Sequence, residues 1–443
     1  MHLDRRACQD YYCSQLQNGG SYFQGVSHQR GYGMFSNLFR MISPIAMKAG
    51  KYLGKHILST GSKIDERACA CVSNAYDLFT VNPVQLSTEE SSFTEIFPVA
   101  SLSDKTPIEF FFSGVGESYL DLAHTLLHLQ VKITKKNGSN IATPDVVAPV
   151  NYLLNTLFSE CSITLNDKQV SSQANYAYRC MFDALLSPKA VQESLLTAGL
   201  FFRDSPGKID ATEILNAGEG FKTRYNICKD SKLMDMIGAL NFDLGNQSKY
   251  LINSVNLRIK LERNKDAFAL MSASQDFKIV IQHASLFVRK VKVAPSILIA
   301  HETALSRGAI KMSLRRTEVK SFALSSGMQS ITIPNAFIGQ VPARLIMDGN
   351  RMIPSKPYQP KFDTSNSYSR CYMSLFTDLG RYHKDQDINI SYSEYKDEYT
   401  LLAIDLTPDL SADGMHDSVL RNSNLALDIR FSKALPETVN LIV

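Results

Sequence analysis

The chain has 443 residues, of which 44% are hydrophobic, 9% aromatic and 20% charged, the usage of ordinary globular proteins. Its 47 Lys and Arg nearly balance 43 Asp and Glu, and a net charge of +4 is too small to indicate a nucleic-acid binder that uses its whole surface. No apolar run approaches 18 residues, so we expect no transmembrane helix. The polar start lacks the apolar centre of a secretory signal, so we expect a protein that is made in the cytoplasm and not secreted.

The basic character is concentrated near the N-terminus. Residues 1–70 hold nine Lys and Arg against four Asp and Glu, and residues 11–64 contain no acidic side chain. Residues 1–33 are rich in Gly, Gln, Ser and Tyr and hold too little apolar surface to pack, which predicts a flexible arm.

An amphipathic helix, kinked at Pro44, is predicted for residues 34–59. Its apolar residues recur at spacings of three and four, with lysines on the opposite side. Such a helix can lie on an anionic membrane, dock on protein, or contact nucleic-acid phosphates, and these three readings stay open for residues 28–63. The candidate contact residues are Phe35, Leu38, Phe39, Arg40, Ile42, Lys48, Lys51, Lys55 and Lys63.

From about residue 76 the hydrophobic pattern has the period of two that is typical of strands. Clear alternation covers residues 127–133, 257–261 and 425–431. Further strand candidates are residues 108–112, 277–281, 286–293 and 399–406. Helical patterns are confined to the short segments 150–159 and 177–186. The sequence therefore predicts an all-β body with short helical insertions.

A weak internal repeat suggests that this body is doubled. The segments that begin at Leu257 and Leu427 each have an alternating strand followed by a polar turn. We therefore divide the chain into an arm and helix (1–75), a first β unit (76–272) and a second β unit (273–443). Each β unit is long enough for a sandwich of about eight strands, such as a jelly roll.

No catalytic or cofactor motif stands out. His124 and His128 have the i, i+4 spacing of a zinc-binding helix, but His128 falls on the polar side of a predicted strand. The glycines Gly114 and Gly116 lack the remaining residues of a nucleotide-binding loop. The eight cysteines are scattered without a C-x-x-C pair. We expect a protein that is not an enzyme and that has no cofactor.

Several segments carry a family resemblance. They are YDLFTVNPVQ at residues 76–85 and the segments 148–166, 231–240, 255–268, 333–344 and 424–443. As a set, they are similar to segments of the double jelly-roll major capsid proteins of Polinton/Maverick elements and related large DNA viruses. The resemblance covers about 80% of the chain and leaves out the N-terminal arm.

The resemblance implies two consecutive eight-stranded jelly rolls, a homotrimeric capsomer that contacts neighbouring capsomers, and a place in the virion after assembly in the cytoplasm or nucleus. The arm is more similar to a minor, membrane-interacting capsid component. Its Gly19-Gly20 pair resembles the sites cut by adenovirus-type maturation proteases. The protease and the minor or vertex capsid proteins are thus further expected partners.

Two alternatives stay open. The chain could be a minor or vertex capsid component, pentameric or monomeric. In a different class, it could be a jelly-roll binding module or a cupin-like enzyme. The enzyme would need a His/Glu cluster on facing strands, and the nine histidines are dispersed along the sequence.

Overall fold

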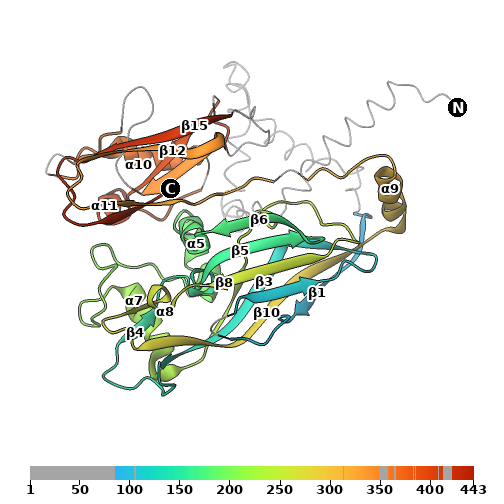
Figure 1. Cartoon of the computed structure of the whole chain (residues 1–443), viewed down its shortest axis with the longest axis horizontal. Coiled ribbons are helices and arrows are strands. Elements are labelled where there is room, and N and C mark those ends of the chain that lie inside the picture. The colour runs from blue at the N-terminus through green and yellow to red at the C-terminus, as the bar shows by residue number, and fades with distance from the viewer. Residues whose placement is uncertain are drawn as a thin grey trace, which may run out of the picture. The chain divides into compact units, whose positions relative to one another are not determined.

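The computed structural model describes residues 85–103, 106–312, 314–348, 358–363, 366–382, 384, 386–407, 409–412 and 422–443. Residues 87–443 form one compact unit, rich in β-strands and with short helices (Figure 1). The predicted arm, the predicted amphipathic helix with all its candidate contact residues, and Gly19 and Gly20 lie outside the described residues.

Two four-stranded antiparallel sheets build the first part of this unit. One sheet has the order β1 (Thr88–Ile96), β10 (Phe277–Val293), β3 (Ser118–Lys135) and β7 (Met234–Ala239). The other has the order β2 (Ile108–Phe112), β8 (Leu257–Arg263), β5 (Phe158–Leu165) and β6 (Lys168–Ala174). A short pair, β4 (Val147–Pro149) and β9 (Leu270–Ser272), stands beside them. We call residues 87–293 the first β body.

The two sheets share one hydrophobic core, which is why the first β body is a sandwich. The predicted alternation in β3 is confirmed, because Leu127, Leu129 and Val131 are fully buried while the residues between them face away from the core. From the other sheet, Phe110 and Ile259 join the same core. An eight-stranded, two-sheet body of this kind is of the jelly-roll type.

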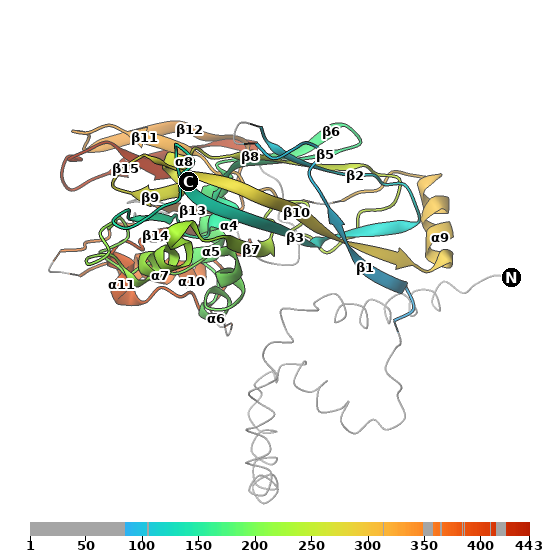
Figure 2. The same cartoon turned by 90° about the horizontal axis from the view of Figure 1, so that it is seen from below.

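Strand pairing in the first β body is nested. The first strand pairs with the last (β1 with β10), the second with the next-to-last long strand (β2 with β8), and the third with the strand before that (β3 with β7). Figure 2 shows the long strands β3 and β10 side by side, with the helix α9 (Pro295–Leu305) beyond one end of the pair.

Short helices decorate this body, and one helix prediction is wrong over most of its length. In the segment 150–159 only α4 (Leu153–Thr156) is helical, because Phe158 already begins β5 and pairs with β8. Tertiary pairing here overrides a local helical pattern. The other segment forms α5 (Tyr176–Leu185) as predicted. The remaining helices here are α6 (Lys189–Gln192), η1 (Leu195–Gly199), α7 (Glu219–Cys228), η2 (Lys229–Ser231) and α8 (Asp266–Ala269).

The strand β10 changes the division expected from the sequence. Segments 277–281 and 286–293 were expected to open the second unit, but they form one strand between β1 and β3. Ile279, Leu286 and Val288 of this strand are buried in the first core. The repeat at Leu257 corresponds to β8, and one long strand still follows it in the same body. The boundary expected after residue 272 is therefore too early, and the change of body falls after Val293.

Residues 321–443 form a second β body, whose described strands are again nested. Its pairs are β11 (Ser321–Leu324) with β16 (Val439–Ile442), β12 (Ser330–Gln340) with β15 (Asn422–Arg430), and β13 (Arg344–Asp348) with β14 (Leu401–Asp405). It also contains α10 (Ser369–Thr377) and α11 (Tyr392–Lys396) (Figure 1). Its own core includes Leu375, Leu402 and Leu427. Among the described helices of the chain, none has the length and apolarity of a membrane span.

Candidate assembly surfaces

One face of the sheet β1-β10-β3-β7 packs on the core, and the opposite face carries large apolar side chains that water reaches. Phe93 is 54% exposed and Ile237 39%, and Phe97, directly after β1, is 59% exposed. We call this the outer sheet face, with Phe93, Glu95, Phe97, His128, Asp235, Ile237, His283 and Phe287 as its defining residues. Exposed apolar side chains that gather on one face often mark an interaction surface.

A β-bulge decides which β10 side chains reach the outer sheet face. Ile281 pairs with Val131 and His283 pairs with Gln130, so Gln282 is an extra residue that has no partner in this register. Because side chains alternate along a strand, one extra residue reverses the facing of those that follow. Ile281 accordingly packs against the core, whereas His283, two residues later, faces outward.

The outer sheet face brings together two histidines that are far apart in the sequence. The rings of His128 and His283 lie with centroids 5.1 Å apart. Nε2 of His283 is 3.8 Å from Oε1 of Glu95. Nε2 of His128 donates to Oδ1 of Asp235 at 2.7 Å, and this hydrogen bond lowers the pKa of the Asp235 carboxyl below its ordinary value. The sequence alone does not reveal this group, because its assembly depends on strand register and on the bulge.

The histidine pair that the sequence singled out does not share a site. Nδ1 of His124 contacts Asp121 at 2.8 Å, and Asp121 also accepts from Arg289 at 2.7 Å. His128 contacts Asp235 instead. The cupin-like alternative required a His/Glu cluster on facing strands. The cluster found here lies on neighbouring strands of one sheet and faces away from the core, so it does not form the interior site of such an enzyme.

The helix α9 is a second exposed apolar element. None of its residues is buried, and Ile299 is 64% exposed. It is anchored on one side, where Ile297 and Leu298 pack near Tyr119 and where the Tyr119 hydroxyl lies 2.8 Å from Nδ1 of His301. Its free side therefore exposes apolar surface, at Ile299 and Leu305.

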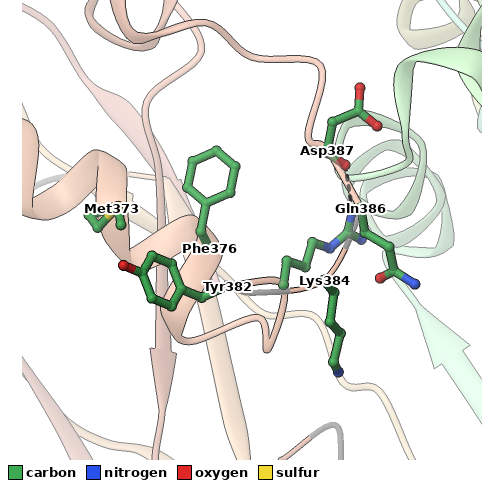
Figure 3. A pocket seen from close by; sticks show the side chains of 7 residues that line it. Met373, Phe376, Tyr382, Lys384, Gln386 and Asp387 are labelled. Atoms are coloured by element: carbon green, nitrogen blue, oxygen red, sulfur yellow. Dashed lines mark hydrogen bonds between the residues drawn. The ribbon is translucent and has the colours of Figure 1, made fainter. Parts of the chain in front are cut away.

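The second β body has an open depression of about 640 Å³ (Figure 3). Its lining combines apolar and charged side chains: Met373, Phe376, Arg381, Tyr382, Lys384, Gln386 and Asp387. Arg381 donates to the main-chain carbonyl of Asp387 at 2.9 Å, drawn as a dashed line in Figure 3. Burial and the nearby Arg344 lower the pKa of the Arg381 guanidinium.

Polar contacts join the two β bodies within the compact unit. Arg203 forms an ion pair with Glu394 at 3.1 Å, and its guanidinium lies 4.6 Å from the ring centroid of Tyr399. The Tyr399 hydroxyl donates to the main-chain carbonyl of Asp204 at 2.7 Å, and burial raises the pKa of Tyr399 to about 12. Leu186 adds an apolar contact, because it packs in the core of the second β body.

Comparison with known proteins bears on the fold. A chain of the Sputnik virophage structure, determined by cryo-EM, superposes with a TM-score of 0.51 at 12% identity, over 83% of this chain and 88% of that chain. The two chains share a fold. A chain of the quasi-atomic model of the PBCV-1 virus capsid gives a TM-score of 0.48 at 9% identity, over 82% of this chain and 95% of that chain.

In sequence, an uncharacterized protein of Caenorhabditis elegans is 23% identical over an alignment of 399 residues, which covers 80% of this chain and 92% of that relative. No family model matches the chain. The likeness to the virophage chain and the strand pairing agree on a mostly β, jelly-roll type of fold, and the all-β prediction is confirmed.

Proposed function

We propose that the chain is a capsid-type structural protein with a double jelly roll, and that it assembles as a homotrimer. Three chains with two β bodies each would present six similar units around one axis, a pseudo-hexagonal outline that can tile a shell. The proposed location is the virion, where each trimer contacts neighbouring capsomers. The fold shared with a chain of the Sputnik virophage supports this reading.

The observation that carries the proposal is the nested pairing, which occurs twice in one chain. In each β body the first strand pairs with the last: β1 with β10, and β11 with β16. The second pair, β2 with β8 and β12 with β15, follows the same plan. The repeat that begins at Leu257 and Leu427 falls on β8 and β15, which hold equivalent places in the two bodies. Duplication of one plan is what a trimer needs to imitate six-fold symmetry.

The outer sheet face is the proposed contact between copies. A face that meets only water would be expected to carry polar side chains, because burial of the other face already supplies the core. Phe93, Phe97 and Ile237 instead expose apolar surface there. A second copy of this chain is the proposed occupant, since obligate oligomers bury roughly 2,000 Å² or more at comparatively apolar interfaces.

Light scattering coupled to size exclusion tests the oligomer. The expected mass is about 148 kDa, three times the 49.4 kDa of the chain. Electron microscopy of the same fraction should then show hexagonal arrays. A stable pentamer would favour the vertex component, and a stable monomer a decorating subunit or a binding module; either result would overturn the trimer.

A matched pair of variants tests the proposed interface. The double substitution Phe93→Ser with Phe97→Ser should reduce the mass to that of one chain. Leu215→Ser removes an apolar side chain that is even more exposed, at 94%, but lies outside the outer sheet face, and it should leave the trimer intact. A trimer that survives the double substitution would exclude the outer sheet face as the contact.

The N-terminal segment has a separate proposed role. Residues 28–63, with Arg40, Lys48, Lys51 and Lys55, are proposed to contact a membrane or the nucleic acid inside the shell, and Gly19-Gly20 is proposed as a cleavage site of a maturation protease. A peptide of residues 31–63 should release dye from anionic vesicles at micromolar concentration. Absence of leakage would remove the membrane role.

A further inference from the structure

We propose that Glu95, His128 and His283 on the outer sheet face bind a divalent transition-metal ion of the Zn²⁺ class. In the described part of the chain, these are the three His, Cys, Asp or Glu side chains whose ligand atoms gather most closely, all within 4.8 Å of one another. The inference does not rest on the proposed capsid function, because all three ligands come from one chain.

The donor set selects the metal. Two imidazoles and one carboxylate form a common ligand set of protein-bound zinc, whereas Ca²⁺ and Mg²⁺ prefer oxygen donors only. Imidazole also binds Ni²⁺ and Cu²⁺, so the site belongs to a class of ions rather than to one element. Three protein ligands leave a fourth position for water.

The distances are close to those that coordination requires. Zinc bonds of about 2.0–2.2 Å place tetrahedral donor atoms roughly 3.3–3.5 Å apart. Nε2 of His283 and Oε1 of Glu95 are already 3.8 Å apart. The ligand atoms of the three side chains, one from each, all lie within 4.8 Å of one another. Side-chain rotations that move these atoms by about one ångström would bring them to the separation that coordination requires. In the single chain the side chains of His128, His283 and Glu95 are 20%, 33% and 37% exposed, so an ion can reach them from solvent before a second copy covers the outer sheet face.

The backbone holds the three ligands on adjacent strands. Glu95 is on β1, His283 on β10 and His128 on β3, which are consecutive in the sheet order. The bulge at Gln282 turns His283 outward, so that it shares a face with His128. Bulges commonly re-aim a side chain beside a functional site.

Groups around the ligands resemble the surroundings of a metal centre. Asp235 holds His128 through the 2.7 Å hydrogen bond to its Nε2, as carboxylates do for histidines that bind zinc. The Ser285 hydroxyl lies 3.2 Å from Nε2 of His283 and would give up this contact when that nitrogen binds the ion. The rings of Phe97 and Phe287 stand 6.0 Å from His283 and 6.3 Å from His128, and give the site an apolar wall. We assign Asp235 as a positioning residue, not a ligand.

The ion would tie β1 to the strands beside it. β1 is the terminal strand of its sheet, and terminal strands open most easily and expose unpaired backbone groups. A bond from Glu95 through the metal to two histidines would hold this edge in place. Bound Zn²⁺ should therefore stabilise the folded chain by mass action and protect the β1 amides from exchange.

Zinc titration of the full chain, stripped of metal and followed by calorimetry, tests the site. The wild type is expected to bind one Zn²⁺ that His283→Asn and Glu95→Gln each weaken by more than about 100-fold. Asp235→Asn should weaken it by about 10- to 100-fold, the effect typical of a group that orients a ligand. His301→Asn changes a histidine that contacts Tyr119 instead and should have no effect.

Hydrogen exchange supplies a readout that does not depend on other metal-binding residues of the chain. Added Zn²⁺ should slow exchange of the β1 amides in the wild type and in His301→Asn, but not in His283→Asn. Far-UV circular dichroism should be unchanged in all variants, because the substituted side chains face outward. A wild type whose β1 amides do not respond to Zn²⁺, or a His283→Asn variant that binds and responds as the wild type does, would overturn the site.

Discussion

The two β bodies follow the same nested strand order but are reinforced in different ways. In the first β body each nested pair belongs to a four-stranded sheet, and buried ion pairs stand beside the shared core. In the described part of the second β body the strands form separate two-stranded pairs, and helices and stacked tyrosines lie beside them. The strand order is therefore common to both bodies, whereas the side chains that stabilise it differ from one body to the other.

In the first β body the stabilising group is a buried arginine. Arg224 is fully buried and donates to the carbonyls of Pro149 and Phe202 and to both carboxylate oxygens of Asp204. Burial raises the pKa of Asp204 even though Arg224 favours its charged form. These bonds fix the chain around α7 to the strand β4.

In the second β body, contacts between aromatic rings provide the local stabilisation. Tyr368 stacks on Tyr392 at 4.5 Å between ring centroids, and Tyr372 meets Tyr395 edge-on at 5.5 Å. The Tyr395 hydroxyl donates to the carbonyl of Leu401 at 2.8 Å, which ties α11 to β14. Packing between aromatic rings thus helps to stabilise the second β body, whereas the first β body has the wider, four-stranded sheets.

The largest loss of stability is expected when the buried arginine is replaced. Arg224→Met leaves the Asp204 carboxylate buried without its partner, and such a loss costs about 3–5 kcal/mol of stability. Urea unfolding should show this as a lower midpoint. Arg258→Met is the control, because Arg258 forms a partly exposed pair with Glu109 that is worth at most about 1 kcal/mol. Equal losses in the two variants would mean that burial of the Arg224–Asp204 pair does not add to the stability of the first β body.

A medium effect is expected at a close approach between two segments of the first β body. A Cβ on Gly114 would stand 2.4 Å from main-chain atoms of Val255, which cannot move aside as a flexible side chain would. Gly114→Ala should cost about 1–3 kcal/mol, the usual cost of overpacking. Gly308→Ala, with nothing within 4 Å of the added carbon, should change the unfolding midpoint little. A neutral Gly114→Ala would mean that these segments separate at low cost.

The smallest expected effect is the pH dependence of the stability that Glu394 provides at the contact between the two β bodies. Burial alone would raise the pKa of Glu394, but hydrogen bonds from Ser391 and Arg203 bring it below its ordinary value of 4.5. A lowered carboxyl pKa stabilises the fold above pH 4.5, and this stabilisation disappears as the pH falls through the lowered pKa.

Glu394→Gln should therefore lower the urea midpoint at neutral pH, and the difference from the wild type should shrink on acidification. Glu193→Gln, in an exposed pair with Lys189, should differ little from the wild type at either pH. A difference between Glu394→Gln and the wild type that stays constant with pH would contradict this origin.

Sequence patterns predicted the strands whose burial alternates locally. β3, β8 and β15 were all found in this way, because a sandwich strand with one buried face carries a period of two in its own residues. The body to which β10 belongs could not be predicted, since its partners β1 and β3 lie far away in the sequence. The proximity of His128 and His283 could not be predicted either, because the two residues are far apart in the sequence and because the bulge at Gln282 decides which way His283 faces.

Nested pairing also dictates the order in which the chain can fold during synthesis. Ile96 of β1 pairs with Leu286 of β10, so the edge of the first sheet stays without its partner until nearly the whole first β body has been made. Closing such long loops makes folding slow, and it leaves strand edges exposed in the meantime. The second β body repeats the delay, since β11 waits for β16. Each body therefore completes its fold only with its last strand, and a nascent chain needs protection from aggregation twice.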